Sequence, residues 1–498
     1  MLLKRNAGVL LHITSLPNKS GVGTLGKEAY SFIDWLKKSN MSVWQVLPLV
    51  PTNYGDSPYQ SVSSTALNYY LIDFDILEEK GLLDKQDYAD INFATSENKV
   101  NYESLFNTKV KILRKAFSKF DVKSDEFKEF IKSGKYSDFA LFMTIKEQNE
   151  YKAWQYWDEE YKVYSLELAK KIKTKYKDDF LFWQWTQYEF ELEWNQLHKY
   201  AKKNGIQIMG DMPLYVAYDS VEVWKTPELF DLDENKQPRL VAGCPPDAFS
   251  EDGQLWGNPI YNWAYMKEKK YKWWTMRINR AFELVDILRI DHFRGFDRYY
   301  TIPYGDETAR NGKWEHGPKF DLFKDKTTLN IVAEDLGFID EGVYTLLRNT
   351  QYPGMKILEF ALDGDPKNEH KPSNYSFNYV VYTGTHDNMP MYQYLLDLEE
   401  EEHEVVVNDV VEECKLLKIK PNIKTDKEIV ETLVELAFAS KANMCIIPMQ
   451  DLLVQDGKTR MNLPSTVSTN NWSYRVKEEE LSEELSEKLA ALAKKYKR

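Results

Sequence analysis

The chain has 498 residues, of which 43% are hydrophobic and 29% charged, and its formal net charge at pH 7 is −13. This composition excludes disordered, fibrous and disulfide-stapled chains. The acidic balance argues against nucleic acid or an anionic membrane surface as a partner. The cysteines are widely spaced and no apolar run is long enough to span a bilayer, so we expect a cytoplasmic protein. Aromatic residues reach 14%, an excess that makes a carbohydrate partner worth testing, because sugar rings stack on aromatic side chains.

Eight short apolar segments, each ending in polar or small residues, are predicted to be buried strands. The first two cover residues 8–16 and 43–48, and an amphipathic helix is expected between them over 29–40. The other six cover 206–213, 287–295, 331–337, 355–362, 379–388 and 444–449. Near-continuous apolar runs are typical of parallel strands that are covered on both faces. Eight such strands with intervening helices predict an α/β fold, a (β/α)8 TIM barrel.

The chain is much longer than a typical barrel of about 250 residues, so we expect large, mainly helical inserted subdomains. The aromatic-rich segment between the second and third strands has mostly helical spacing. Residues 1–60 are expected to form the first part of the barrel, 61–205 an inserted helical subdomain, and 206–498 the remainder. A loop insertion over about 214–286 belongs to this last part, and a charged helix is expected after Lys477.

Polar and charged residues occupy the predicted carboxyl ends of several strands, where barrel enzymes place their chemistry. An unpaired acid is costly to bury, so acids on several strand ends together indicate a functional site. These strand-end residues are Asp211 on the third strand, Arg289, Asp291 and His292 on the fourth, Glu334 on the fifth, and His386, Asp387 and Asn388 on the seventh.

Two of these acids are expected to differ in protonation. Arg289 and Asp291 are two residues apart on a strand and therefore face the same side, so the guanidinium should hold the pKa of Asp291 low. Glu334 is surrounded by other acids, which should raise its pKa and keep it protonated. One ionised and one protonated carboxyl is the arrangement that cleaves glycosides with retention.

An ordered set of motifs gives the chain a family resemblance. RIDHFRG at 289–295, AEDLG at 333–337 and GTHDN at 384–388 resemble the three catalytic motifs of the 4-alpha-glucanotransferases, the amylomaltases or disproportionating enzymes, which are related to the alpha-amylases. Segments 56–60, 210–213, 245–259 and 460–475 match as well. Within 460–475 the family often has a glycine where this chain has Ser465. We expect this difference to affect a turn of the backbone more than the chemistry.

The resemblance implies a retaining double displacement on α-1,4-glucans, with glucose or another glucan as acceptor and with no metal or cofactor. It makes Asp291 the nucleophile, Glu334 the general acid/base and Asp387 the residue that holds the reacting sugar in its distorted transition state. It also implies substrate contacts by Tyr59, Asp211, Phe249, Trp256, Asn258, Arg289, His292, His386 and Asn388, and an outlying second glucan site at Tyr54.

Two other functions stay open from the sequence. An amylase-like hydrolase would use the same three acids and differ only in accepting water instead of a sugar hydroxyl. A non-catalytic glucan-binding protein would keep the aromatic residues but would not need the acids. A long aromatic loop at 245–259 favours transfer, because a bound acceptor sugar excludes water. The oligomeric state is not predicted.

Overall fold

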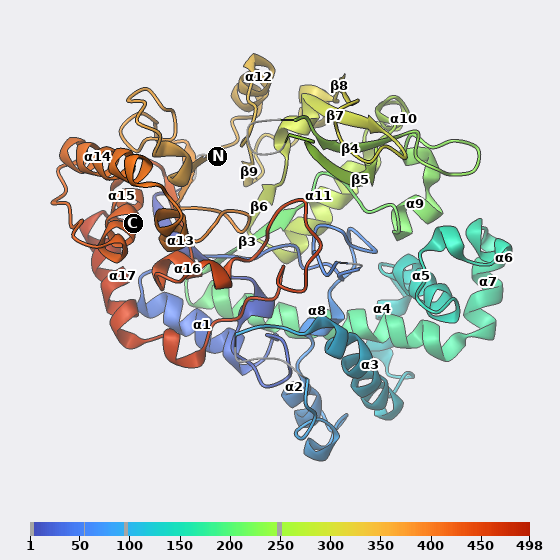
Figure 1. The fold of residues 1–498 in the computed structure, drawn as a ribbon. Helices are drawn as coiled ribbons and strands as arrows, with labels where there is room; N and C mark the ends of the chain where they lie inside the picture. The colour runs from blue at the N-terminus through green and yellow to red at the C-terminus, as the bar shows by residue number, and fades with distance from the viewer. Residues whose placement is uncertain (1–3, 54, 94–97, 247–250) are drawn as a thin grey trace.

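The computed structural model describes residues 4–53, 55–93, 98–246 and 251–498, and eight parallel strands form the barrel at its centre (Figure 1). The neighbouring strands run in the order β10-β11-β12-β1-β2-β3-β6-β9. The backbone N–H of Ala333 donates to the carbonyl oxygen of Pro353 at 2.9 Å and so links the two ends of this sheet. The predicted barrel and all eight of its strands are confirmed. The strands are β1 (Asn6–Leu10), β2 (Val43–Gln45), β3 (Gln207–Met212), β6 (Ile287–Ile290), β9 (Ile331–Ala333), β10 (Gly354–Ile357), β11 (Tyr379–Tyr382) and β12 (Met444–Pro448).

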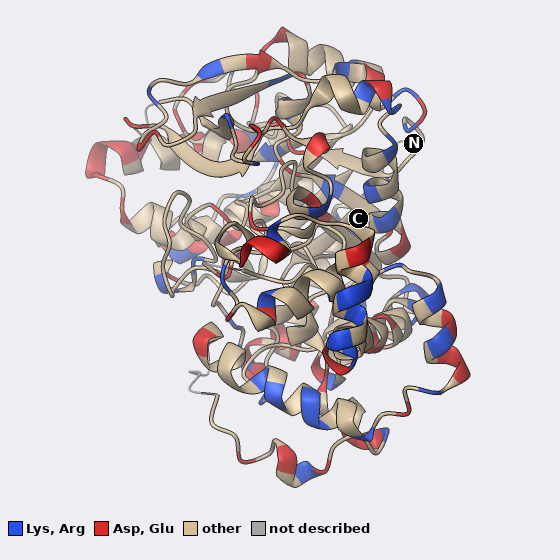
Figure 2. Ribbon diagram, turned by 90° about the vertical axis from the view of Figure 1, so that its right-hand side faces the viewer, with Lys and Arg blue, Asp and Glu red and all other residues tan. Residues whose placement is uncertain are grey.

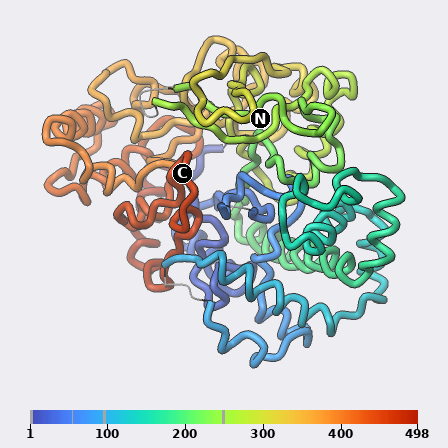
Figure 3. The backbone as a smooth tube through the Cα atoms, turned by 45° about the vertical axis from the view of Figure 1, so that its right-hand side comes forward, coloured from blue at the N-terminus to red at the C-terminus, as the bar shows by residue number. Residues whose placement is uncertain are grey.

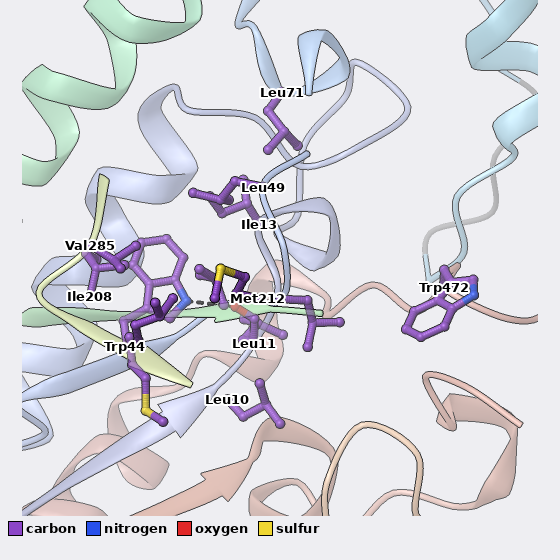
Figure 4. Close-up of a cluster of buried hydrophobic side chains, with 14 of the residues drawn as sticks. Leu10, Leu11, Ile13, Trp44, Leu49, Leu71, Ile208, Met212, Val285 and Trp472 are labelled. Carbon is purple, nitrogen blue, oxygen red and sulfur yellow. Dashed lines mark hydrogen bonds between the residues drawn. The ribbon is translucent and has the colours of Figure 1, made fainter. Parts of the chain in front are cut away.

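The strands end earlier than predicted, because the polar residues that follow each apolar run leave the hydrogen-bonded ladder. β6 ends at Ile290, and His292 already has a left-handed backbone with φ of 51°. Inside the barrel wall the apolar side chains pack closely, and Trp44 of β2 donates its indole N–H to the carbonyl oxygen of Leu11 at 2.7 Å (Figure 4). Gly8 is required in β1, since a Cβ there would lie 2.2 Å from the Val43 carbonyl oxygen.

Helices follow most of the barrel strands. The helix expected over 29–40 is α1 (Lys27–Lys38), whose apolar side is buried against the barrel. The helix directly before β6 is α11 (Lys272–Leu284), at the end of the segment expected as a loop insertion. The helices after β9 are α12 (Glu341–Thr350), α13 (Met391–Leu396), α14 (Glu400–Leu417), α15 (Asp426–Ala439), α16 (Met449–Leu452) and α17 (Glu483–Lys495). The last of these is the charged helix expected after Lys477.

The segment between β2 and β3 is helical, as predicted, and lies on one side of the barrel (Figure 3). Its tryptophans, among them Trp183, Trp185 and Trp194, are buried and form its core. The division into domains at residues 60 and 205 stays a prediction. The helices here are α2 (Phe74–Glu79), α3 (Tyr102–Lys119), α4 (Asp125–Lys132), α5 (Ser137–Gln148), α6 (Glu159–Lys162), α7 (Leu166–Lys175) and α8 (Lys177–Lys203).

A second sheet, which the sequence analysis missed, lies over the carboxyl ends of β3 and β6. It is antiparallel, with the order β5-β4-β7-β8. Its strands are β4 (Leu240–Cys244), β5 (Gln254–Pro259), β7 (Arg298–Pro303) and β8 (Lys313–His316), flanked by α9 (Val221–Lys225) and α10 (Trp263–Glu268). The sheet was hidden because two strands lie before β6 and two after it, and because these strands are short and only partly apolar.

Acidic and basic residues are interspersed along the surface helices (Figure 2). Among the described residues, no helix is both long enough and apolar enough to cross a membrane.

Candidate active site

Two acids stand side by side at the carboxyl ends of neighbouring barrel strands. Ile290 of β6 pairs with Ala333 of β9, and the next residues along each strand are Asp291 and Glu334. The backbone N–H of Asp291 donates to Met212 at 3.0 Å, and that of Glu334 donates to Ile290 at 3.1 Å. The barrel backbone therefore fixes the positions from which both carboxyls project, at a strand separation of about 4.8 Å.

Arg289 joins two of the predicted acids. Its guanidinium donates from Nη1 to both oxygens of Asp211, at 2.6 and 2.8 Å, and its Nη2 lies 3.0 Å from Oδ1 of Asp291. The Tyr59 hydroxyl also donates to Oδ2 of Asp211, at 2.9 Å. Arg289 and Asp211 are almost completely buried. The expected contact between Arg289 and Asp291 is confirmed, and Asp211 is the residue that anchors the other side of the guanidinium.

Burial controls the protonation of the two acids. It raises the pKa of Asp291 to about 6, although Arg289 acts in the opposite direction. The expectation that Arg289 holds the pKa of Asp291 low is therefore wrong, because loss of hydration outweighs the one arginine. Burial also raises the pKa of Glu334 to about 8, with the charge of Asp291 adding to the rise. The predicted order remains: near pH 7, Asp291 is mainly ionised and Glu334 mainly protonated.

Two backbone amides hold Glu334 in place. The N–H of His292 donates to its Oε2 at 2.6 Å, and the N–H of Leu336 donates to its Oε1 at 2.8 Å. Both bonds favour the ionised carboxylate and lower its pKa, against the effect of burial. The carboxyl is thus oriented in either protonation state.

Asp387 lies in the loop that follows β11 and is more open than the other two acids. Its side chain is 44% exposed, compared with 29% for Asp291. Asn462 donates to its Oδ1 at 2.7 Å, and Arg460 donates to its backbone carbonyl oxygen at 2.5 Å. Nε2 of His386 lies 3.5 Å from the same Oδ1. Asp387 is therefore held from one side and leaves its other oxygen available to a ligand.

The aromatic residues expected to bind sugar lie beside these acids. The ring of Tyr59 stacks on His386, with centroids 5.1 Å apart. Trp256 on β5 meets the His292 ring edge-on at 4.9 Å, and its indole N–H donates to Gln254 at 3.0 Å. Both rings are only partly buried, so the structure leaves part of each available for stacking.

Two of the remaining predicted residues, Asn258 and Asn388, have hydrogen-bond partners of their own. Asn258 is buried and donates to the Val216 carbonyl oxygen at 2.9 Å. Asn388 donates to Glu359 at 3.0 Å. His292 has its pKa lowered to about 3 by burial, and its Nε2 has no hydrogen-bond partner among the described residues. Tyr54 and Phe249 lie outside the described residues.

Comparison with known proteins identifies the family of this chain. The model of the 4-alpha-glucanotransferase family matches residues 11–482. The chain belongs to the 4-alpha-glucanotransferase family. The chain is 44% identical to a 4-alpha-glucanotransferase of Clostridium butyricum, an alignment that covers 98% of this chain and 99% of the relative. A 4-alpha-glucanotransferase of Aquifex aeolicus is 42% identical, with 95% of this chain and 96% of the relative covered.

The structural comparison agrees with the family assignment. The amylomaltase from Streptococcus agalactiae in complex with acarbose has a TM-score of 0.93 and 42% identity, over 99% of this chain and 100% of the other. The amylomaltase from Corynebacterium glutamicum, at 16% identity and a TM-score of 0.78 over 98% of this chain and 75% of the other, shows the shared fold. These findings favour the transferase over the amylase-like hydrolase.

Several residues of this transferase site were missed from the sequence. His12 follows β1, and its Nδ1 accepts the Leu47 N–H at 3.2 Å; burial, and then His386, lower its pKa to about 3. The rule that strand ends carry function applies to β1 as well and could have identified this histidine. Arg460 and Asn462 lie in a loop without periodicity, so only the resemblance over 460–475 pointed to them. Among the described residues, no three His, Cys, Asp or Glu side chains form a group suited to a metal ion.

Proposed function

We propose that this 4-alpha-glucanotransferase moves a segment of an α-1,4-glucan to the 4-hydroxyl of glucose or of another glucan by a retaining double displacement. The observation that carries this proposal is the pair of acids on neighbouring strand ends, a partly buried Asp291 with a pKa of about 6 and a more deeply buried Glu334 with a pKa of about 8. Retaining enzymes need one carboxylate as nucleophile and one carboxylic acid as proton donor. The acarbose complex of the Streptococcus agalactiae amylomaltase supports a sugar ligand in this fold.

In the first step the Asp291 carboxylate attacks the anomeric carbon and the bond to the leaving 4-oxygen breaks. Glu334 gives its proton to that oxygen, so the departing glucan leaves as a neutral alcohol and a glycosyl ester remains on Asp291. In the second step the ionised Glu334 removes the proton from an incoming 4-hydroxyl. That oxygen attacks the anomeric carbon, the ester bond breaks, and Asp291 returns as a carboxylate.

The surrounding residues have supporting roles in this proposal. Arg289 orients Asp291 and favours its ionised form, since it contacts that carboxylate at 3.0 Å. Asp387 uses its open oxygen to hold hydroxyls of the reacting sugar as the ring flattens towards the transition state. Tyr59 and His386 form one stacked unit beside that sugar, and His292 and Asn388 line the same site.

Acceptor binding decides whether the ester is transferred or hydrolysed. We place the acceptor sugar against Trp256, whose ring is held by its hydrogen bond to Gln254 and remains partly open. A sugar stacked there excludes water from the ester. We also propose that the enzyme acts in the cytoplasm, which its widely spaced cysteines support.

The experiment that tests the mechanism is Glu334→Gln, which keeps the shape of the side chain and removes its titratable proton. General acid–base catalysis is typically worth about 10²–10⁴-fold, and we expect maltotriose turnover to fall by that order. An α-glucosyl fluoride needs little protonation to leave, so the ester should still form and should accumulate on Asp291. Mass spectrometry of the intact variant would show the added sugar.

A neighbouring acid offers a matched control. Asp335 is also buried, and burial raises its pKa to about 6, but its Oδ1 accepts the N–H of Met355 at 2.6 Å. Asp335→Asn should alter stability without trapping any ester. Near wild-type turnover of maltotriose by Glu334→Gln would overturn the assignment of Glu334, and an equal adduct in Asp335→Asn would show that accumulation is not specific to the acid/base.

A further inference from the structure

The strand that carries Trp256 is irregular at this residue. One residue of β4 lies between the partners of Leu255 and Pro259, whereas three residues of β5 lie between those two, namely Trp256, Gly257 and Asn258. We call these three residues the β5 bulge. Gly257 has a left-handed backbone with φ of 76°, which suits a glycine in a bulge. A bulge interrupts the regular ladder, so pairing with β4 does not by itself fix the direction of the Trp256 ring.

The side chain of Gln60, from the loop after β2, supports the β5 bulge. Its Nε2 donates to the Trp256 carbonyl oxygen at 3.3 Å and to Oδ1 of Asn258 at 3.1 Å. Nδ2 of Asn258 donates back to Oε1 of Gln60 at 3.3 Å and also to the Val216 carbonyl oxygen at 2.9 Å. The two side-chain amides therefore pair in both directions, and the bulge is tied to the loops after β2 and β3.

The loop that presents Gln60 is itself fixed beside the acids. The backbone N–H of Gln60 donates to the Ser57 carbonyl oxygen at 3.2 Å, and that of Tyr59 donates to Oγ of Ser57 at 3.2 Å. The Tyr59 hydroxyl donates to Asp211 at 2.9 Å. Two consecutive residues thus connect the two sides of the site, because Tyr59 contacts the acids and Gln60 holds the backbone of Trp256.

Gln60 holds Trp256 relative to the acids in a way that the indole hydrogen bond cannot. The indole N–H donates to Gln254 of the same strand, so this bond moves together with β5. An amide side chain supplies a donor and an acceptor at once, and both groups of Gln60 are used. Asn258 is only 4% exposed, so removal of Gln60 would leave buried polar groups without a partner. The bulge would have to shift to satisfy them, and the Trp256 ring would shift with it.

We propose that Gln60 is a positioning residue, which holds the β5 bulge and thereby sets how much of the glycosyl ester is transferred to a sugar instead of to water. This proposal rests on the proposed function, in which the acceptor sugar stacks on Trp256. A displaced ring weakens binding of the sugar but not access of water, so the loss of Gln60 should increase the share of hydrolysis.

The test is Gln60→Ala, with α-maltosyl fluoride as donor and glucose as acceptor. The burst of fluoride measures ester formation, and chromatography of the sugars gives the ratio of transfer to hydrolysis. A hydrogen bond is worth about two- to tenfold in an equilibrium constant. With both donated bonds lost, we expect this ratio to fall by roughly three- to thirtyfold, while the fluoride burst keeps most of its rate. Gln60→Glu keeps the size of the side chain but cannot donate when ionised, and it should lower the ratio as well.

A double-mutant cycle shows whether Gln60 acts through Trp256. In the Trp256→Ala background, Gln60→Ala should cause no further change in the ratio of transfer to hydrolysis. Gln187→Ala is the matched control. Gln187 is also a buried glutamine that holds the backbone of the loop after β2, since it donates to the Leu67 carbonyl oxygen at 3.0 Å and accepts the Leu67 N–H at 2.7 Å. Its replacement should lower stability and leave the ratio unchanged.

Three results would overturn the role of Gln60. They are an unchanged ratio in Gln60→Ala, a further fall in the Trp256→Ala background, and an equal fall in Gln187→Ala. A fluoride burst that falls as steeply as transfer would also overturn it, because Gln60 would then act on the donor side through Tyr59.

A measurement without substrate separates this inference from the proposed function. Amide hydrogen exchange of the segment 254–259 should become faster in Gln60→Ala and stay unchanged in Gln187→Ala. Unchanged exchange in Gln60→Ala would show that Gln60 does not hold the β5 bulge. Hydrolysis without any transfer by the wild-type enzyme would contradict the proposed function, while the exchange of 254–259 would still decide whether Gln60 holds the bulge.

Discussion

Replacing Arg289 by glutamine tests how the nucleophile is kept ionised. Nη2 of the Arg289 guanidinium lies 3.0 Å from the Asp291 carboxylate. Burial raises the pKa of Asp291 and Arg289 lowers it, and the net value is about 6. Loss of an opposite charge at this distance raises the pKa of a carboxyl by about one to three. At pH 7 a carboxyl with a pKa of about 6 is roughly 90% ionised. A rise of about two would reduce this to roughly 10%, a ninefold loss of active nucleophile from protonation alone.

The sign of the pH effect follows from the charge. Removing a cation favours the neutral acid, so the acidic limb of kcat/KM should move from near pH 6 to higher pH. Arg289 also lowers the pKa of Glu334, so the alkaline limb near pH 8 should move to higher pH as well. The whole bell-shaped profile therefore shifts to higher pH, and the rate at pH 7 falls. The assay is glucose release from maltotriose between about pH 5 and 9 in buffers of equal ionic strength.

Stability has to be measured alongside activity. Breaking a buried ion pair costs about 3–5 kcal/mol, and Arg289→Gln also leaves Asp211 buried beside Tyr59. Arg289→Lys is the companion variant, because it keeps the charge but cannot reach both carboxylates as the planar fork does. It should retain the acidic limb near its wild-type position with a lower maximum rate. A folded Arg289→Gln enzyme whose acidic limb stays near pH 6 would refute the electrostatic role of Arg289.

Two further substitutions test the acceptor surface and a strained turn. Trp256→Ala should reduce transfer to sugar acceptors more than hydrolysis, measured as glucose release against total reducing ends; an equal fall in both would assign Trp256 to the donor side or to the fold. Ser465 has a left-handed backbone with φ of 63°, which costs a non-glycine residue about 1–2 kcal/mol. Ser465→Gly should therefore stabilise the enzyme by up to about 1 kcal/mol, since the glycine is also freer in the unfolded chain, and a lower thermal midpoint would contradict this account.

The barrel was predictable because each of its strands is a local apolar run, as in β12, where Met444–Pro448 is buried throughout. The strand-end rule then located Asp291, Glu334 and Asp387 without any knowledge of tertiary contacts. The antiparallel sheet was not predictable in the same way. Its pairing of Leu240 with Pro303 joins residues from both sides of β6, and such register is set by tertiary packing.

The sequence predicted that Glu334 has a higher pKa than Asp291, but it did not predict what sets the two pKa values. The sequence shows that Arg289 and Asp291 share a face, and it suggests that acids crowd Glu334. It does not show how deeply each carboxyl is buried, which is the larger effect for both. Nor does it show that one guanidinium nitrogen of Arg289 donates to both oxygens of Asp211, while the other terminal nitrogen contacts Asp291. Burial depth and sharing of one cation are properties of the folded site.

Burial and the backbone amides act in opposite directions on the pKa of Glu334. This suits a residue that first has to donate a proton and then accept one. Burial alone would leave Glu334 a permanent acid, able to protonate the first leaving group but unable to accept the acceptor's proton. The amides of His292 and Leu336 stabilise the carboxylate that remains after the first proton is given away. Burial raises the pKa to about 8 against the lowering effects of Arg289 and of these amides, and this value is close enough to neutrality for both protonation states to be reached within one turnover. The short loop after β6 therefore contributes to both steps: Asp291 supplies the nucleophile, and the next peptide N–H prepares Glu334 to be the base.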